Sequence, residues 1–355
     1  MGLGWALNAG GTITRTIMGL PDEDANGYTA HADRIIDYLN GVPDTNMSVK
    51  DEDVAWWTAT GIWDSEPDIY YYNIGGMSGK MVFDKTGTPR MIPHANLSIT
   101  GSVTTGFTVK SPDGTTYVFG ASESTTTSTT GDDPNYTSGN TAFNLTSITG
   151  VNGSNINFTY ERDILDYSID RSQTKRHNMP GFTEAECAES GSIIHNDILY
   201  TVSAGRVSKI ETDLIVVKFI ENSISNSFGM KYLDRIEVYN KNNLSVPIRE
   251  YDLTISNFGT GNERGKLESV VEKDGLGNTL SPYTFDYNDV SFPVRHSSKQ
   301  DHWGYYNSNP SDDLIPETSQ LTYTVAGSPH TIDYGGADRS PSAARSQALM
   351  LTKIT

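Results

Sequence analysis

The sequence predicts a mostly β protein, an extended array of antiparallel β-hairpins with one or two short helices near the N-terminus. Three observations support this class. The 355 residues include 33 Gly and 19 Tyr in a chain rich in Thr, Ser and Asn, and these residue types favour strands and the tight turns between them. Short strand-like segments separated by turn residues recur after residue 69. A four-residue pattern, apolar–polar–polar–apolar, repeats through the C-terminal half.

Residues 1–68 form the predicted mixed N-terminal segment, where the helices are expected. The stretch Thr29–Leu39 places Ile35 and Ile36 on one face and acidic side chains on the other, as an amphipathic helix does. A second helix is predicted over Asp51–Gly61, because its first turn is acidic and complements the positive end of a helix dipole.

Residues 69–144 form the predicted first β-hairpin region. The tripeptide Pro112-Asp113-Gly114 lies between two strand-like runs, and Gly after Asp tolerates the positive φ that a hairpin turn requires. Residues 121–139 are dominated by Ser and Thr without apolar alternation, so they are predicted to form a polar surface loop.

Residues 145–355 form the predicted hairpin array, with insertions at about 170–192 and 296–345. The repeated pattern marks the first arm of each hairpin, and a second strand follows a turn in all but the last copy. Because the last copy has no second strand, we expect the chain to be a fragment that is truncated inside its final hairpin. The first arms are Leu145–Ile148, Val207–Ile210, Leu233–Ile236, Leu267–Val270 and Leu351–Ile354, and the second arms are Asn157–Glu161, Val217–Glu221, Arg249–Leu253 and Tyr283–Tyr287.

The charge balance excludes one class of partner. The chain carries 26 Lys and Arg against 44 Asp and Glu, a formal net charge of −18, and no basic block that could bind a nucleic-acid backbone. No apolar run approaches the roughly 20 residues that a membrane span needs. The single cysteine, Cys187, excludes an intrachain disulfide framework.

Five motifs are distributed over nearly the whole chain: residues 2–15, residues 63–68 followed by 76–80, residues 111–120, residues 300–307 and residues 336–341. Together they resemble the region that precedes the repeats in large bacterial RHS (YD-repeat) proteins. Within them, the residues expected to form structural motifs are Gly2, Gly4, Trp5, Trp63, Asp301, His302, Trp303, Tyr305, Asp338 and Arg339.

The resemblance implies a secreted or cell-surface polypeptide whose β-hairpins wind into a strip that encloses a hollow shell. Related shells occur in the cocoon components of Tc toxins and in teneurins. We therefore expect a structural, non-enzymatic segment that encapsulates or presents a downstream C-terminal effector, with the rest of its own polypeptide as partner. No catalytic residues are expected, and Trp5, Trp303 and Tyr305 are expected to pack in the shell.

Acidic clusters are candidate calcium sites, because carboxylates are the hard ligands that Ca²⁺ prefers. The loop that begins at Asp22 would need a glutamate at its twelfth position, where the shorter Asp33 stands in a predicted helix. Solvated turns and helix caps are the alternative, and no other cofactor is expected. The candidate ligands are Asp22, Asp24, Asp64, Glu66 and Asp68.

Two other functions remain open. A glycan-binding or adhesive module, with a cell-surface glycan or protein as partner, would present exposed aromatic rings. A glycoside hydrolase would need two carboxyl groups about 5–9.5 Å apart in a cleft. The candidate rings for the first are Trp56, Trp57, Trp63, Tyr70, Tyr71 and Tyr72.

Overall fold

The computed structural model describes residues 4–42, 50–130, 136–175, 193–225, 231–258, 264–288, 290, 293, 297–311, 313–318, 320–325, 327–332 and 335–355. Gly2, Cys187 and residues 176–192 of the predicted insertion lie outside these ranges.

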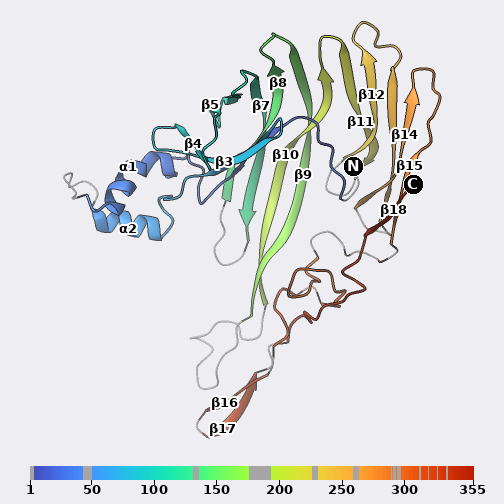
Figure 1. The fold of residues 1–355 in the computed structure, drawn as a ribbon. Coiled ribbons are helices and arrows are strands. Elements are labelled where there is room, and N and C mark those ends of the chain that lie inside the picture. The colour runs from blue at the N-terminus through green and yellow to red at the C-terminus, as the bar shows by residue number, and fades with distance from the viewer. Residues whose placement is uncertain are drawn as a thin grey trace.

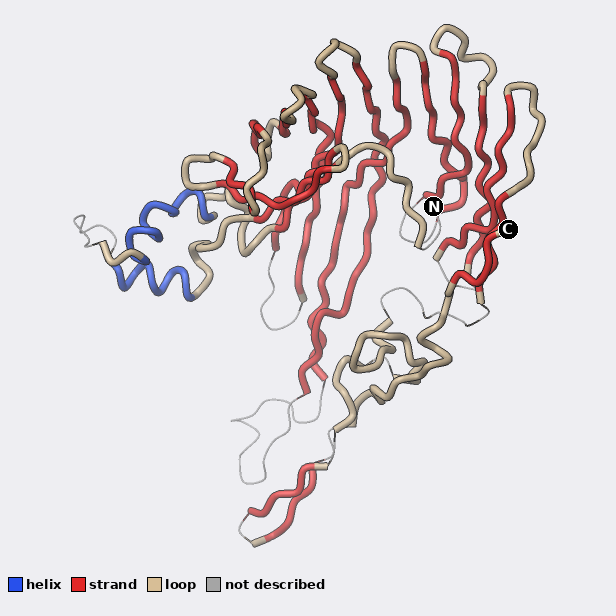
Figure 2. Tube along the Cα trace, in the orientation of Figure 1, coloured by secondary structure: helices blue, strands red, loops and turns tan. Residues whose placement is uncertain are grey.

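The predicted class is confirmed: the chain is mostly β, with a large antiparallel sheet and two short helices (Figures 1 and 2). The helices are α1 (Tyr28–Leu39) and α2 (Asp51–Ala59). The strands are β1 (Thr12–Thr16), β2 (Ile69–Ile74), β3 (Met77–Phe83), β4 (Pro89–Ile92), β5 (Ser98–Ser102), β6 (Gly106–Lys110), β7 (Thr116–Thr129), β8 (Tyr136–Thr149), β9 (Asn155–Lys175), β10 (Ile193–Glu211), β11 (Ile215–Ser225), β12 (Lys231–Asn240), β13 (Arg249–Asn257), β14 (Gly265–Asp274), β15 (Tyr283–Tyr287), β16 (Leu321–Val325), β17 (Ser328–Ile332) and β18 (Leu351–Ile354).

The sheet follows the order β18-β15-β14-β13-β12-β11-β10-β7-β8-β1-β2-β3-β4, with β5 and β6 joined through β7, and β9 joined to β8 and β10. Strands β16 and β17 form a separate hairpin. Figure 1 shows the array from β9 to β15 as a single curved layer, with the helices beyond β3 and β4.

The predicted hairpins are confirmed arm by arm. The first arms lie in β8, β10, β12 and β14, and each pairs antiparallel with the strand that carries its second arm. The turns use glycine where the backbone requires it, since φ is +82° at Gly153 and +83° at Gly277. The fifth first arm, β18, pairs with β15.

The prediction of a polar loop over residues 121–139 is wrong. Strand β7 continues to Thr129 and β8 begins at Tyr136, so most of this segment forms the two arms of one long hairpin. The hydroxyl groups of Thr125 and Thr141 lie 2.8 Å apart across the pair. Threonine has a high strand propensity without being apolar, and cross-strand hydroxyl contacts take the place of apolar alternation here.

The predicted helices are confirmed, with α2 ending at Ala59, two residues before the predicted Gly61. Helix α1 buries Ala32 and Ile35, and α2 buries Val54. Together the helices form a small unit at the end of the sheet (Figure 1).

The apolar core lies in the N-terminal half, between β1, β2, β3, β5, β6, β7 and β8. Its aromatic rings meet edge to face, as in the pair Phe107 and Phe143, whose centroids lie 4.8 Å apart. This core anchors the sheet from which the array extends. Its buried members are Ile13, Tyr70, Tyr72, Ile74, Met81, Ile99, Phe107, Val109, Phe119, Phe143 and Leu145.

Two long hairpins, β7–β8 and β9–β10, cross each other. At one end of the crossing β8 pairs with β9, and further along β7 pairs with β10. Glu123 of β7 accepts hydrogen bonds from the Gly205 amide (2.9 Å) and from Asn144 Nδ2 (2.8 Å). A Cβ on Gly205 would lie 2.8 Å from Asn144 Nδ2, so glycine permits this close approach.

The array beyond the crossing has two chemically different faces. The row formed by Lys218, Glu237, Glu250 and Lys273 runs across β11 to β14 in register. The neighbouring row, formed by Phe219, Ile236, Tyr251 and Glu272, points to the opposite face, because side chains alternate along a strand. One face of the array therefore carries the charged row, and the other is mainly apolar over β11 and β12.

The N-terminal segment, residues 4–11, crosses the apolar face as a strap (Figure 1). At one end the Gly11 carbonyl accepts a hydrogen bond from the Leu145 amide (3.0 Å). At the other end Trp5 Nε1 donates to Tyr287 Oη (2.8 Å), and the Trp5 ring packs 4.5 Å from Phe285. The strap thus ties β8 to β15, two strands far apart in the sheet order.

Candidate functional site

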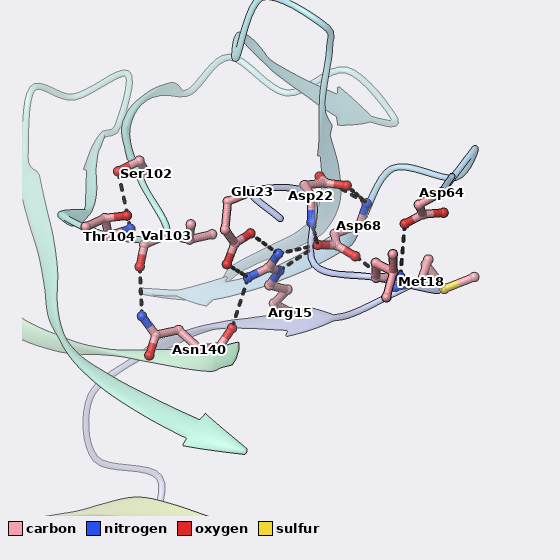
Figure 3. A network of polar contacts seen from close by, with 11 residues as sticks. Arg15, Met18, Asp22, Glu23, Asp64, Asp68, Ser102, Val103, Thr104 and Asn140 are labelled. Atoms are coloured by element: carbon pink, nitrogen blue, oxygen red, sulfur yellow. Dashed lines mark hydrogen bonds and ion pairs between the residues drawn. The ribbon is translucent and has the colours of Figure 1, made fainter. Parts of the chain in front are cut away.

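Arg15 is the centre of the most extensive buried polar network that the structure describes (Figure 3). It alternates with Ile13 along β1, so both side chains point into the core. Its Nε donates to Asp68 Oδ2 (2.8 Å), and its two Nη atoms donate to the carboxylate of Glu23 at 3.0 and 2.5 Å. Arg15 Nη1 also reaches the Asn140 carbonyl of β8 (3.5 Å).

Asp68 links this ion pair to the turn that follows β1. Its Oδ1 accepts from the Met18 amide (2.8 Å) and its Oδ2 from the Asp22 amide (3.1 Å). In return, the Asp68 amide donates to the carboxylate of Asp22 at 3.1 and 3.2 Å. The two aspartates therefore hold each other's backbone, and Asp68 also binds the guanidinium.

Asp64 holds the same turn from the other side. Its Oδ2 accepts from the Leu20 amide (3.1 Å) and its Oδ1 from the Glu66 amide (3.0 Å). Gly19 has φ of +75°, and a Cβ there would lie 2.9 Å from Asp64 Oδ1. Glycine is required at this position both for its backbone conformation and for space.

The carboxylates of the network differ in acidity. Burial, together with the nearby charge of Asp68, raises the pKa of Asp22 to about 7. Burial opposes ionisation of Glu23 as well, but its hydrogen bonds to Arg15 and the guanidinium charge outweigh burial and lower its pKa. Burial also raises the pKa of Asp64.

A cavity of about 170 Å³ opens beside the network, with Asp22, Glu23, Tyr70 and Phe83 in its wall. Glu23 is bound by Arg15, and Asp22 accepts from the Asp68 amide. Both carboxylates therefore already accept hydrogen bonds from the protein. The main role of the network is to hold together β1, the turn that follows it and the residues at the start of β2.

Three of the five candidate calcium ligands, Asp22, Asp64 and Asp68, meet in this network. Asp24 and Glu66 are exposed at its edge. The positive charge that the acidic cluster requires comes from Arg15 and the remaining contacts from backbone amides. Within the described ranges, no group of three or more His, Cys, Asp or Glu side chains has the arrangement of a metal site.

Sequence reasoning missed Arg15 as a functional residue. The available signal was the alternation of Ile13 and Arg15 in a strand, which places a charged side chain on the core face. A buried guanidinium needs carboxylate partners, but the sequence did not identify which of the 44 acidic residues supply them.

The N-terminal motif residues have packing roles in the described structure. Trp5 makes the strap contact with β15, and Gly4 precedes it with φ of +80°. Trp63 stacks on His31 with ring centroids 3.8 Å apart and an interplanar angle of 6°, and it also contacts Trp57 at 4.5 Å. Trp63 therefore joins the two helices to the segment that precedes β2.

Trp303 and Tyr305, which are expected to pack in the shell, are largely exposed in the described part of this chain. Their side chains are 70% and 60% exposed, whereas Asp301 is buried. Asp301 Oδ1 accepts from the amides of Trp303 (2.9 Å) and Tyr305 (3.0 Å), and Gly304 has φ of +87°. Asp301 thus forms a tight turn that directs the aromatic rings outward, and His302 is exposed on the same turn.

Arg339 organises the irregular segment around that turn. Its Nη1 donates to the carbonyls of Ser298 (2.7 Å) and Gln300 (2.6 Å), and its Nη2 to those of Asp313 (2.7 Å) and Leu314 (3.0 Å). The neighbouring Asp338 caps the Ser340 amide (2.8 Å). One buried guanidinium therefore holds two loop segments together.

The candidate aromatic platform is divided between the core and the surface. Tyr70 and Tyr72 are buried, and Trp57 and Trp63 contact each other. Trp56 and Tyr71 are exposed, at 58% and 46%, but they lie on different elements, α2 and β2. These rings do not form one continuous surface.

No protein-family model and no curated protein matches the chain. Among solved structures, a crystal structure of TcdB2–TccC3–Cdc42 covers 82% of this chain and 14% of that chain, with a TM-score of 0.39 and 12% identity. A crystal structure of TcdB2–TccC3–TEV covers 100% of this chain and 17% of that chain, with a TM-score of 0.38 and 13% identity. The Photorhabdus luminescens Tc holotoxin pore gives 81% and 14% coverage, a TM-score of 0.35 and 11% identity.

The chain thus spans only 14% to 17% of the length of these proteins. Scores and identities this low do not establish a shared family or activity. Within the described part of the chain, no helix combines the length and the apolar character that a membrane crossing would need.

Proposed function

We propose that this chain is a structural, non-enzymatic wall segment of a larger RHS-type shell, which encapsulates or presents an effector carried further along the same polypeptide. The observation that carries the proposal is the order of the array. From β10 to β15 each strand pairs with the next strand in sequence, so the wall grows one hairpin at a time, as in repeat architectures.

The chemistry of the two faces supports a wall. On the charged face, Lys273 pairs with Glu250 (2.8 Å) and Arg235 pairs with Glu237 (2.7 Å). These pairs neutralise the charges without a second layer of protein. The opposite face is partly covered by the strap, so the strap and the curved sheet together suit a single-layer wall.

The polar networks support a structural role. Arg15 and Arg339 each join segments that are distant in sequence, and their donors are taken by carboxylates or backbone carbonyls. A catalytic acid or base needs access to a substrate proton. Asp68, the carboxylate at the centre of the Arg15 network, is completely buried.

A role as part of such a shell implies that the complete polypeptide is secreted or displayed at the cell surface. The test is protease protection of the segment that follows this chain in its complete gene product. We expect that segment to resist a protease until the wall is cut at an engineered cleavage site in the 212–214 turn between β10 and β11. Digestion at the same rate before and after that cut would contradict encapsulation.

A further inference from the structure

A cavity of about 500 Å³ lies in the irregular segment that contains Asp301 and Arg339. Its wall includes His302, Trp303, Glu317 and Thr318. None of these residues belongs to the Arg15 network or to the hairpin array, and the proposed wall function does not use them.

Trp303 supplies the cavity with a flat apolar surface. Its side chain is 70% exposed, which is uncommon for so large an apolar ring and often marks a binding surface. The backbone that carries the ring is fixed, because Asp301 Oδ1 accepts the Trp303 amide and the Asp301 carbonyl accepts the Gly304 amide (3.1 Å). A ligand that stacks on the ring therefore orders only the side chain and not the turn.

Three polar side chains beside this ring are uncommitted. Those of His302, Glu317 and Thr318 make no hydrogen bond or ion pair with any residue in the described ranges. They offer both donors and acceptors, since a carboxylate accepts, a hydroxyl does both, and an imidazole can do either. The cavity therefore combines an apolar plane with a mixed hydrogen-bonding rim.

The rest of the lining is preorganised. The Arg339 guanidinium is engaged by four carbonyl oxygens. The Asp338 carbonyl accepts a hydrogen bond from Asn307 Nδ2 (2.8 Å). This bond joins the irregular segment around Asp338 to the residues that follow the Asp301 turn. Hydrogen bonds therefore fix the backbone around the cavity, whereas the side chains of His302, Glu317 and Thr318 are exposed to solvent.

The charges of the lining select among ligands. Glu317 and Asp338 are acidic, and both Nη atoms of Arg339 are engaged by backbone carbonyls. An anionic ligand would meet two carboxylates, so it is disfavoured. A neutral ligand with hydroxyl groups meets no such repulsion.

We propose that this cavity is a binding site for a neutral oligosaccharide, with Trp303 stacked on the apolar face of one sugar ring. The rim residues His302, Glu317 and Thr318 contact its hydroxyl groups. A pyranose ring presents an apolar face and a belt of hydroxyls that donate and accept, which matches the plane and the mixed rim.

The test is titration of the chain with maltohexaose, cellohexaose, mannohexaose and N-acetylchitohexaose, with calorimetry and tryptophan fluorescence as readouts. We expect at least one of them to bind with 1:1 stoichiometry, and Trp303→Ala to weaken that binding at least about ten-fold. Glu317→Ala should weaken it by a smaller factor. Trp56→Ala, which removes an exposed ring from α2, is the matched control and should bind as the unmodified chain does.

Three results would overturn the proposal: no binding of any of the four sugars at millimolar concentration, binding unchanged by Trp303→Ala, or tighter binding of hexagalacturonate than of every neutral sugar. Because Trp303→Phe retains an aromatic ring in the turn, it provides a second measurement. The fluorescence difference between this variant and the unmodified chain isolates Trp303, and the bound sugar should protect that component from acrylamide quenching.

Discussion

Arg15 and Asp68 form an ion pair in which both side chains are fully excluded from solvent, although 53 positions separate them in the sequence. The pair joins β1 to the segment just before β2, and Glu23 completes the coordination of the guanidinium. Burial of both charges makes each partner dependent on the other, because a lone buried charge is strongly unfavourable.

Arg15→Met should lower the free energy of unfolding by about 3–5 kcal/mol, because it leaves Asp68 buried without its counter-charge. Chemical denaturation followed by fluorescence measures this loss. Lys85→Ala is the control, since it removes a solvent-exposed ion pair with Asp33, and such pairs contribute little. Equal denaturation midpoints for the two variants would contradict a stabilising role of the Arg15 network.

Asp22 should make the stability of the chain fall as pH rises. Its ordinary pKa of 3.8 is raised to about 7 in the folded chain, so the folded state binds more protons than the unfolded state between these values. The stabilisation from that proton is complete below about pH 4 and is lost as pH rises to about 7.

Asp22→Asn keeps an oxygen that can accept from the Asp68 amide and removes the titration. Relative to this variant, the unmodified chain should lose stability from pH 4 to pH 8, on the order of 2–4 kcal/mol. Unfolding free energies of both proteins at several pH values provide the measurement. Parallel pH profiles for the two proteins would be inconsistent with a titrating Asp22.

Gly205→Ala should destabilise the crossing of the two long hairpins by about 1–3 kcal/mol. The added Cβ would lie 2.8 Å from Asn144 Nδ2 and 3.3 Å from Glu123 Oε1. Gly120→Ala is the matched control in β7, because a Cβ there meets its nearest neighbour, the Thr146 hydroxyl, at 3.4 Å. Thermal unfolding of both variants tests the difference, and equal melting temperatures would show that the crossing tolerates a side chain.

Trp5→Ala should release the N-terminal strap from the apolar face. The variant loses the hydrogen bond to Tyr287 and the contact with Phe285, at a cost of about 1–3 kcal/mol for a half-buried ring. Hydrogen exchange should become faster in β15 and β18 and remain unchanged in β2 and β3. Trp5→Phe retains most of the ring contact and should show a smaller effect, and uniform protection in all three proteins would contradict the role of the strap.

The sequence predicted the hairpins well where a turn and its two strands are local. The turn at Asn152-Gly153 lies within a few residues of both of its arms, and Asp274 caps the turn before β15. Their residue types therefore carry enough information. The segment from 121 to 139 failed because Ser and Thr are common in loops, and its strand character arises from pairing with β8 and β10.

The contacts that were missed depend on distant segments. The Arg15–Asp68 pair and the Glu123–Gly205 contact, which joins residues 82 positions apart, arise only once the sheet is assembled. The exposure of Trp303 could not be predicted for a related reason, since the expectation that it packs in the shell followed from the family resemblance. Its exposure is set by the Asp301 turn, whose geometry directs the ring outward.

The most direct test of the wall function is cryo-electron microscopy of the complete gene product that contains this chain. The account predicts a closed, hollow particle in which β9 to β15 form a continuous single layer of the wall, with density for other polypeptide in the enclosed space. A compact particle in which both faces of this sheet are covered by packed protein layers, with no enclosed space, would contradict it.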